Sequence, residues 1–228
     1  MFRTKELILF DFDGTLIDSV PDLAAAINHM LSGLGKPAFE ESLVRGWVGN
    51  GARTLVERAL RAAYGEHGYP APADVDAALD VFLHHYAENL AVHTAAFPHV
   101  PEVLQQLHAQ GYRLAIITNK PYAFIEPILQ SMGMDTLFEL TLGGDSLLQK
   151  KPDPQPLLHA CETLGVAPDK CIMVGDSKND ILAAKAAGMQ SIGVGYGYNY
   201  DEAISAYDPD LVCETFCALA APFGVSCG

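Results

Sequence analysis

Four short apolar runs, widely spaced along the chain, constrain its fold more than any other feature. They are residues 7–10, 114–117, 171–174 and 191–194. Each run is too short for a helix, and the runs after Phe97 alternate with segments of helical pattern. Such alternation is typical of a parallel sheet covered by helices. We therefore predict an α/β fold built on a Rossmann-like parallel sheet core.

The segments between the later runs carry helix patterns with clear ends. We expect helices at residues 101–110, 122–132, 154–164 and 179–187. A glycine follows each of these segments, and glycine just past the last helical residue is a common way for a helix to end.

Residues 17–97, between the first two runs, show only helical patterning. Within them, apolar residues recur at steps of three and four, as along one face of a helix. They are Val75, Leu79, Phe82, Tyr86 and Leu90. A crossover between parallel strands needs only about a dozen residues, so this stretch is far longer than a crossover requires. We predict a core domain of residues 1–16 and 98–228 and an inserted all-α cap domain of residues 17–97, with hinges near 16–20 and 92–98.

The charge balance excludes several classes of partner. The chain carries 14 Lys and Arg against 28 Asp and Glu, a formal net charge of −14. A chain this acidic is repelled by nucleic-acid phosphates and by anionic lipid, so we expect neither nucleic acid nor a membrane as a partner. A small anionic ligand stays compatible, because helix N-termini and a few local cations can oppose the net field. The composition leaves the oligomeric state open.

The cysteines point to a reducing environment. Five are present, at positions 161, 171, 213, 217 and 227, and none forms a Cys-x-x-Cys pair. This odd number of thiols does not resemble a disulfide framework. Since no secretory signal is visible either, we expect a reducing compartment, most simply the cytoplasm.

Polar residues of catalytic type follow three of the four apolar runs. They are Asp11, Asp13, Thr118, Asn119, Asp176 and Asp180. In open α/β sheets ligands bind outside the carboxyl ends of the strands, so we expect these residues to meet in one crevice. A single Asp at a strand end is usually a turn former or helix cap. Four of them, with Lys120 and Lys151 nearby in the pattern, indicate instead a site for Mg²⁺, which prefers oxygen ligands and bridges to phosphate.

The same residues carry a resemblance to a known family. The hexapeptide Asp-Phe-Asp-Gly-Thr-Leu at 11–16 resembles the first signature of the haloacid-dehalogenase-like superfamily. Thr118 is similar to its second motif, Lys151 in Lys-Pro-Asp-Pro to its third, and residues 175–180 to its fourth. The motifs occur in order over essentially the whole chain, and the helical insertion resembles the family's cap domain. Four further segments, at 18–23, 47–52, 118–121 and 195–199, resemble the phosphoglycolate phosphatase branch of the superfamily.

This resemblance implies an enzyme and a substrate class. The expected activity is a Mg²⁺-dependent phosphatase that hydrolyses 2-phosphoglycolate to glycolate and phosphate. The alternatives are a phosphatase of another small phosphate monoester such as a sugar phosphate, a phosphomutase, or a non-catalytic binding protein on the same fold. The acid at Asp13 favours phosphate-ester chemistry over dehalogenation, which needs no acid there.

The resemblance also implies roles for individual residues. Asp11 is the expected nucleophile, which forms an aspartyl-phosphate, and Asp13 the general acid and base. The Asp11 carboxylate, the Asp13 backbone carbonyl and the Asp176 carboxylate are the expected Mg²⁺ ligands, with Asp180 acting through water or from behind the direct ligands. Thr118 and Asn119 are expected to bind the phosphoryl oxygens, and Lys151 to neutralise their charge.

One feature of the predicted cap has two readings. Gly49, Asn50 and Gly51 precede an expected helix, and Arg53 follows. The segment is either a helix-entry turn with glycines for backbone freedom, or a loop that binds the non-phosphate end of the substrate. In the second reading Gly49, Asn50 and Arg53 are substrate-binding residues.

Overall fold

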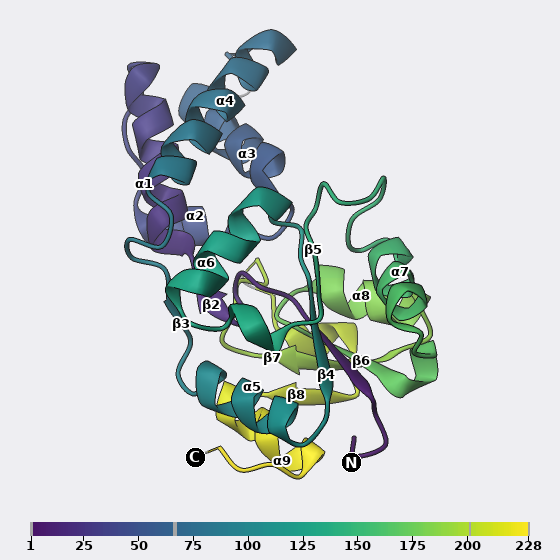
Figure 1. The fold of residues 1–228 in the computed structure, drawn as a ribbon. Helices are drawn as coiled ribbons and strands as arrows, with labels where there is room; N and C mark the ends of the chain where they lie inside the picture. Colours follow the sequence, from purple (N-terminus) through teal and green to yellow (C-terminus); the bar gives the residue numbers. More distant parts are fainter. Residues whose placement is uncertain (1, 66–67, 201, 228) are drawn as a thin grey trace.

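The computed structural model describes residues 2–65, 68–200 and 202–227. Its central strands are β1 Leu7–Phe10, β4 Arg113–Ile117, β5 Leu140–Leu142, β6 Cys171–Gly175, β7 Gln190–Val194 and β8 Leu211–Cys213. They form one six-stranded sheet in the order β5-β4-β1-β6-β7-β8, with every neighbouring pair parallel (Figure 1). The predicted α/β class with a parallel sheet core is therefore confirmed.

The four apolar runs correspond to β1, β4, β6 and β7, each within one residue of its expected bounds. The strands β5 and β8 were not expected from the sequence. Both are three-residue strands at the sheet edges, and two of the three residues in each are only partly buried. An edge strand therefore lacks the continuous apolar run that marks a strand buried on both faces.

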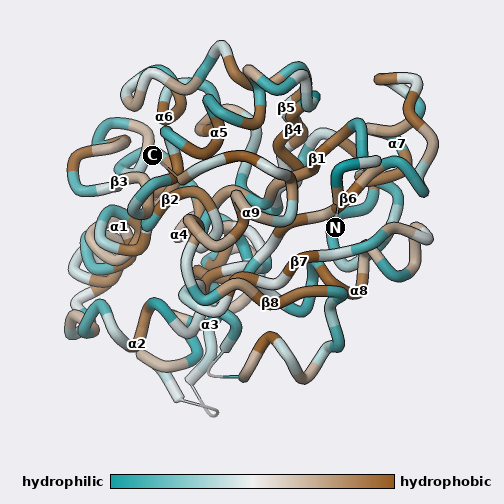
Figure 2. Tube along the Cα trace, turned by 90° about the horizontal axis from the view of Figure 1, so that it is seen from below, coloured by the Kyte–Doolittle hydropathy of each residue, from teal (hydrophilic) through white to brown (hydrophobic). Residues whose placement is uncertain are grey.

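Helices cover both faces of the sheet. They are α5 Val100–Ala109, α6 Ile125–Ser131, α7 Gln155–Leu164, α8 Lys178–Ala186 and α9 Ala220–Phe223. Successive residues of a strand point to opposite faces. In β1, Ile8 and Phe10 join a buried cluster with α5, α6 and α9, whereas Leu7 and Leu9 join a second cluster with α7 and α8. The result is a three-layer core, and hydrophobic residues follow strands such as β1 and β4 (Figure 2).

Within the described residues, the four helices between β1 and β3 (Ala95–Ala96) form a group above the carboxyl edge of the sheet (Figure 1). They are α1 Val20–Gly33, α2 Glu41–Arg45, α3 Ala52–Tyr64 and α4 Pro72–Glu88. The stripe expected on α4 contributes Val75, Phe82 and Tyr86 to a buried cluster that continues into one face of the sheet. The short helix α2 was not expected, because only Val44 of its five residues is buried.

Two short strands connect these helices to the core. They are β2 Ile17–Asp18 and β3 Ala95–Ala96, which pair antiparallel and lie where the sequence predicts hinges. Asp22, at the start of α1, holds the segment that leads from α4 into β3. Its buried carboxylate accepts hydrogen bonds from the backbone N–H groups of His93 and Thr94 and from the Thr94 hydroxyl, at 2.6 to 3.1 Å.

The expectation of unpaired thiols is wrong for two of the five cysteines. Cys217 and Cys227 form a disulfide, whereas Cys161, Cys171 and Cys213 are free and buried. The two bonded residues are ten positions apart and meet because the chain reverses through α9. Sequence spacing alone does not reveal such a reversal.

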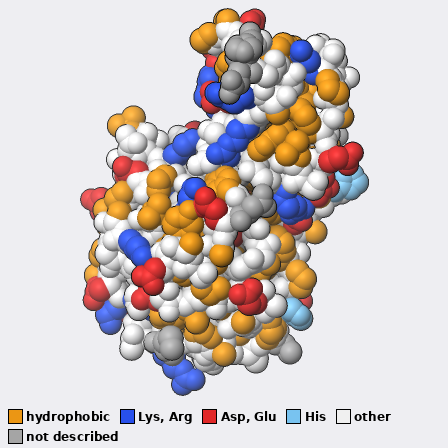
Figure 3. Space-filling model, turned by 180° about the vertical axis from the view of Figure 1, so that it is seen from behind, with side chains coloured by type: hydrophobic (Ala, Val, Ile, Leu, Met, Phe, Trp, Pro, Cys, Tyr) orange, Lys and Arg blue, Asp and Glu red, His pale blue; other side chains and the backbone are white. Residues whose placement is uncertain are grey.

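The surface carries both signs of charge. Figure 3 shows Asp and Glu interspersed with Lys and Arg, and several basic side chains around the narrowing between the upper helices and the sheet. Among the helices of the described residues, none combines the length and apolar character that a membrane crossing requires.

The position of β1 at the centre of the sheet generates a stability prediction. Leu9 is fully buried, whereas Leu182 on α8 is 42% exposed. We expect Leu9→Ala to lower the free energy of unfolding by about 2–5 kcal/mol, because it leaves a cavity between packed layers. Leu182→Ala removes the same atoms from a half-exposed site and should cost less than about 1 kcal/mol. Urea denaturation of both variants checks this, and equal losses would contradict the layer assignment.

Candidate active site

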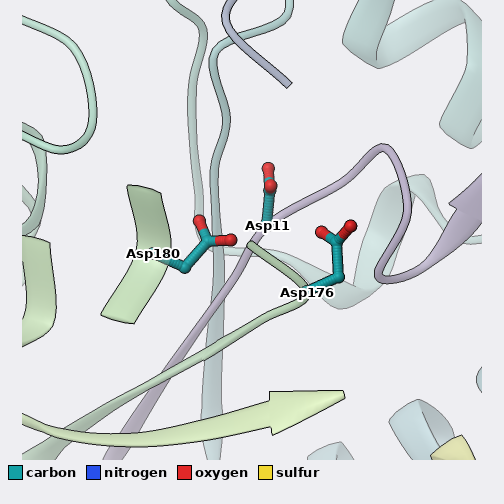
Figure 4. A group of neighbouring side chains, drawn as sticks. All are labelled: Asp11, Asp176 and Asp180. Carbon is teal, nitrogen blue, oxygen red and sulfur yellow. The ribbon is translucent and has the colours of Figure 1, made fainter. Parts of the chain in front are cut away.

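The polar residues expected at the strand ends meet above the carboxyl edge of the sheet. Asp11 follows β1, Thr118 follows β4, and Asp176 follows β6, while Lys151 reaches the same place from the loop between β5 and α7. The strand order reverses around β1, and such a switch point is where open α/β sheets form a crevice. The side chains of Asp11, Asp176 and Asp180 point toward one another (Figure 4).

Asp11 is buried and held in one orientation. Its Oδ1 accepts a hydrogen bond from the backbone N–H of Phe12 at 2.7 Å and lies 3.0 Å from Lys151 Nζ. Burial raises the pKa of Asp11 to about 7, although Lys151 acts in the opposite direction. A nearby cation would therefore favour the ionised carboxylate that nucleophilic chemistry needs.

Asp176 is anchored on both oxygens. Oδ1 accepts from the Thr15 hydroxyl at 3.0 Å, and Oδ2 from the Tyr198 backbone N–H at 2.6 Å. Burial, together with the charges of Asp11 and Asp180, raises its pKa. The chain packs so tightly here that a Cβ at Gly14, which has φ of +85°, would lie 2.3 Å from Asp176 Oδ2. Glycine at position 14 is thus required both by its backbone conformation and by this close approach.

Asp180 connects the helix α8 to Lys151. Its Oδ2 accepts hydrogen bonds from the backbone N–H and the hydroxyl of Ser177, and its Oδ1 lies 2.6 Å from Lys151 Nζ. Burial alone would lower the pKa of Lys151, but Asp11 and Asp180 outweigh it and raise the pKa. Lys151 is therefore a fixed positive charge beneath the site.

These groups fit a divalent cation. Asp11, Asp176 and Asp180 are all buried, and each offers a carboxylate oxygen within 4.8 Å of the others. Counting Asp13 as well, four carboxylates face two ammonium groups, Lys120 and Lys151, so with all four ionised 4 − 2 leaves two negative charges in excess. Oxygen donors with this excess charge suit a hard divalent metal ion.

Asp13 is held beside Lys120. Its Oδ1 accepts from the Ser19 hydroxyl at 2.6 Å, and Lys120 Nζ lies 3.0 and 3.3 Å from its two oxygens. Lys120 also donates to the hydroxyl of Tyr86, on α4, at 2.7 Å. Burial acts to lower the pKa of Lys120, but Asp13 and Tyr86 outweigh it and raise the pKa. The chain of contacts links the inserted helices to Asp13.

Thr118 and Asn119 differ in what their side chains can do. The Thr118 hydroxyl accepts from the Lys120 backbone N–H at 3.2 Å, which leaves its own proton available to a ligand. The Asn119 side-chain amide instead donates to the backbone carbonyls of Gly49 and Lys151, both at 3.0 Å. The side-chain amide thus bridges two loops, and the expected contact of Asn119 with a phosphoryl oxygen would have to come from its backbone. Within the described residues, the backbone N–H of Asn119 has no hydrogen-bond partner, and neither has that of Asp13.

A small cavity of about 40 Å³ opens over Asp11 and Asp13. Thr118, Asn119 and Lys120 line it from the sheet side, and the inserted helices supply apolar walls. The lining from those helices and the loops beside them is Leu23, Val48, Gly49, Gly51, Ala52, Leu55, Phe82 and Tyr86. The site therefore combines charged groups at its floor with apolar groups above, and it has room for a small molecule only.

Of the three substrate-binding residues predicted in the cap, Gly49, Asn50 and Arg53, the structure places only Gly49 at the cavity within the described residues. Gly49 lines the cavity, but the Asn50 side chain accepts hydrogen bonds from Arg58 at 2.8 Å and from the Tyr200 hydroxyl at 2.6 Å. Arg53 does not reach the site at all. Its exposed guanidinium pairs with Asp76 and Glu57, because its place on α3 turns it away from the sheet. The expectation that Arg53 contacts substrate is thus corrected.

Contacts between the loop at 47–51 and the core gather basic side chains near the cavity. Lys150 Nζ donates to the Asn50 carbonyl at 2.6 Å. Arg58 and Lys178 lie over the ring of Tyr200, at 5.2 and 5.1 Å from its centroid. Lys178 is also paired with Glu202 at 3.3 Å, so Lys150 and Arg58 are the cations that bring positive charge to this loop on a chain with a net charge of −14.

Sequence reasoning missed three residues of the site, Ser19, Tyr86 and Tyr198. It placed Lys120 near the carboxylates but gave it no role. Tyr86 was expected only to pack in the cap, and it does stack on Phe82, but its hydroxyl also meets Lys120. A periodic stripe shows which face of a helix is buried and does not show what the tip of a side chain contacts.

Comparison with known proteins agrees with this geometry. The family model described as haloacid dehalogenase-like hydrolase matches residues 8–194. A protein of Colwellia psychrerythraea named phosphoglycolate phosphatase is 50% identical over 215 residues, which cover 94% of this chain and 95% of that protein. The crystal structure of a predicted phosphoglycolate phosphatase from Haemophilus somnus superposes with a TM-score of 0.92 at 40% identity, covering 96% and 98% of the two chains.

A more distant structure shares the same fold. CbbY from Rhodobacter sphaeroides, solved in complex with phosphate, superposes with a TM-score of 0.78 at 26% identity, covering 93% of this chain and 95% of that one. The family match spans most of the sequence, and the structural likeness includes both the sheet and the inserted helices. The chain belongs to the haloacid dehalogenase-like hydrolase family.

Proposed function

We propose that this protein is a Mg²⁺-dependent phosphatase that hydrolyses 2-phosphoglycolate to glycolate and phosphate. The observation that carries the proposal is the pair Asp11 and Asp13, which both face a small cavity. Asp11 also belongs to the cluster of three carboxylates that could hold a metal ion. The name of the relative from Colwellia psychrerythraea supports the substrate, since the match covers nearly the full length of both chains.

Asp11 and Asp13 have different roles in the proposed reaction. A carboxylate oxygen of Asp11 attacks phosphorus, and the bond from phosphorus to the ester oxygen breaks as Asp13 gives that oxygen a proton. Asp13 then takes a proton from water, which attacks phosphorus and releases phosphate from Asp11. Because Ser19 and Lys120 both hold Asp13, its carboxylate stays in one position through both steps.

The acidic cluster would hold the metal ion. Asp11 and Asp176 are the proposed carboxylate ligands, the Asp13 carbonyl is a third, and Asp180 acts through water. When bound, Mg²⁺ would neutralise the excess negative charge and orient the phosphoryl group. Thr15 and Tyr198 keep Asp176 in place for this role.

Hydrogen-bond donors surround the place of the phosphoryl group. The Thr118 hydroxyl and the backbone N–H groups of Asp13 and Asn119 are available to its oxygens. Lys151 adds a buried positive charge next to the nucleophile. Donors fixed before the reaction stabilise the charge that spreads over the transferring group.

Residues 17–97 are the proposed cap, which closes over the substrate and excludes water. Gly49, Gly51 and Ala52 line the cavity, and the first N–H groups of α3 have no partner within the helix. We propose that these backbone groups face the end of the substrate that does not react. The small volume favours a substrate with few atoms beyond the phosphate.

A steady-state comparison of phosphate monoesters tests the function. We expect kcat/KM for 2-phosphoglycolate to exceed that for ethyl phosphate, glycerol phosphates and sugar phosphates by about tenfold or more, the scale of one charged contact. A clear preference for a sugar phosphate would replace the proposed substrate. Activity on none of the esters would contradict the phosphatase assignment.

Two conservative variants test the division of roles. We expect Asp11→Asn to abolish turnover, because an amide is a poor nucleophile, and Asp13→Asn to slow breakdown of the aspartyl-phosphate. Acid quenching with ³²P-labelled substrate should trap label on Asp13→Asn protein and none on Asp11→Asn protein. Label on the Asp11→Asn variant would assign the nucleophile to another residue.

Thermal unfolding with and without Mg²⁺ tests the metal site. At about 100 times Kd, a ligand that binds only the folded state adds about 2.7 kcal/mol to its stability. We expect Mg²⁺ to raise the Tm of the wild type and Asp176→Asn to remove that shift, since the amide supplies no negative charge to the cation. The shift is measured from the metal-free Tm of each protein, because the amide can accept only one of the two hydrogen bonds that Thr15 and Tyr198 donate to Asp176. A full shift in Asp176→Asn would contradict the ligand assignment.

A further inference from the structure

The cavity above Asp11 and Asp13 has an unusual balance of charge. Apart from these two carboxylates, the only charged lining side chain within the described residues is Lys120. Lys120 is 4% exposed, and among the residues that the structure describes its Nζ donates to Asp13 and Tyr86 only. An ammonium group buried to this extent requires anionic partners.

Lys120 lies on the side of the cavity where the leaving group must be. Asp13 has to reach the ester oxygen to protonate it, and Lys120 Nζ is 3.0 Å from Asp13 Oδ1. In 2-phosphoglycolate the carboxylate is separated from the ester oxygen by a single methylene. A group beside Asp13 is therefore also within reach of that carboxylate.

We propose that Lys120, oriented by the Tyr86 hydroxyl of α4, binds the carboxylate of the substrate and is the residue that selects an anionic leaving group. This inference rests on the proposed function and names the group responsible for its specificity. Nζ donates to the Tyr86 hydroxyl at 2.7 Å and to the two oxygens of Asp13 at 3.0 and 3.3 Å, so the substrate carboxylate would take over the longer of the two contacts with Asp13.

Other cations are placed less well for this role. Arg53 pairs with Asp76 on the exposed side of α3. Lys150 bonds to the Asn50 carbonyl and does not line the cavity. The N-terminus of α3 carries only a partial charge, which can support a carboxylate without supplying a full counter-charge. A neutral leaving group gains nothing from Lys120, so Lys120 discriminates by charge.

The test compares two substrates of nearly equal size, 2-phosphoglycolate and ethyl phosphate, in which a methyl group replaces the carboxylate. We expect Lys120→Met to lower the ratio of their kcat/KM values by about tenfold or more, the scale of one charge-assisted hydrogen bond. Rates on both esters will also fall, because Asp13 loses a partner, and the ratio removes that shared effect. Lys150→Met, which deletes the same charge just outside the cavity, should leave the ratio within about twofold.

The outcomes separate this inference from the proposed function. If the wild type prefers 2-phosphoglycolate and Lys120→Met keeps the full preference, Lys120 is not the carboxylate site. A fall confined to Lys150→Met would move the site toward α3 and also overturn the inference. If the wild type shows no preference, the proposed substrate itself is wrong. Should circular dichroism show that Lys120→Met is unfolded, Lys120→Gln carries the same test, because it keeps a donor and removes the charge.

Discussion

Four carboxylates and two lysines gathered at one edge of a buried sheet are the constraint on which the rest of the molecule depends. Burial raises the pKa of Asp176, and the neighbouring charges of Asp11 and Asp180 raise it further. Hydrogen-bond donors stabilise almost every oxygen of these carboxylates, and they include the hydroxyl groups of Thr15, Ser19 and Ser177. The remaining excess of negative charge makes a divalent cation the natural partner of the folded state.

Much of the fold and of the site follows from the sequence because both depend on the same strands. A parallel strand buried on two faces must be a continuous apolar run, so β1, β4, β6 and β7 stand out. The ends of such strands meet at one edge, and the positions of Asp11, Thr118 and Asp176 can therefore be predicted together. The candidate site can therefore be predicted from the sequence, because its residues directly follow strands whose order in the sheet brings them together.

The remaining features depend on contacts between distant segments, which one sequence does not encode in a readable pattern. The direction of Arg53 is set by its turn on α3 and by Asp76, more than twenty positions away. The contact between Lys120 and Tyr86 joins a strand end to a helix of the insertion. Contacts between the loop at 47–51 and the core, such as that from Asn119 to Gly49, depend in the same way on how the inserted helices pack on the sheet.

The insertion thus serves both packing and chemistry. It shares one apolar cluster with the sheet and also supplies the walls of the cavity over Asp11. The central claim is that Asp11 forms a covalent intermediate, and the stereochemistry at phosphorus tests it most directly. Hydrolysis of the phosphorothioate analogue of 2-phosphoglycolate, made chiral at phosphorus with one oxygen isotope and run in water labelled with another, should give chiral thiophosphate with net retention, because two in-line displacements each invert the centre. Net inversion would mean that water attacks the substrate directly, and it would contradict the account.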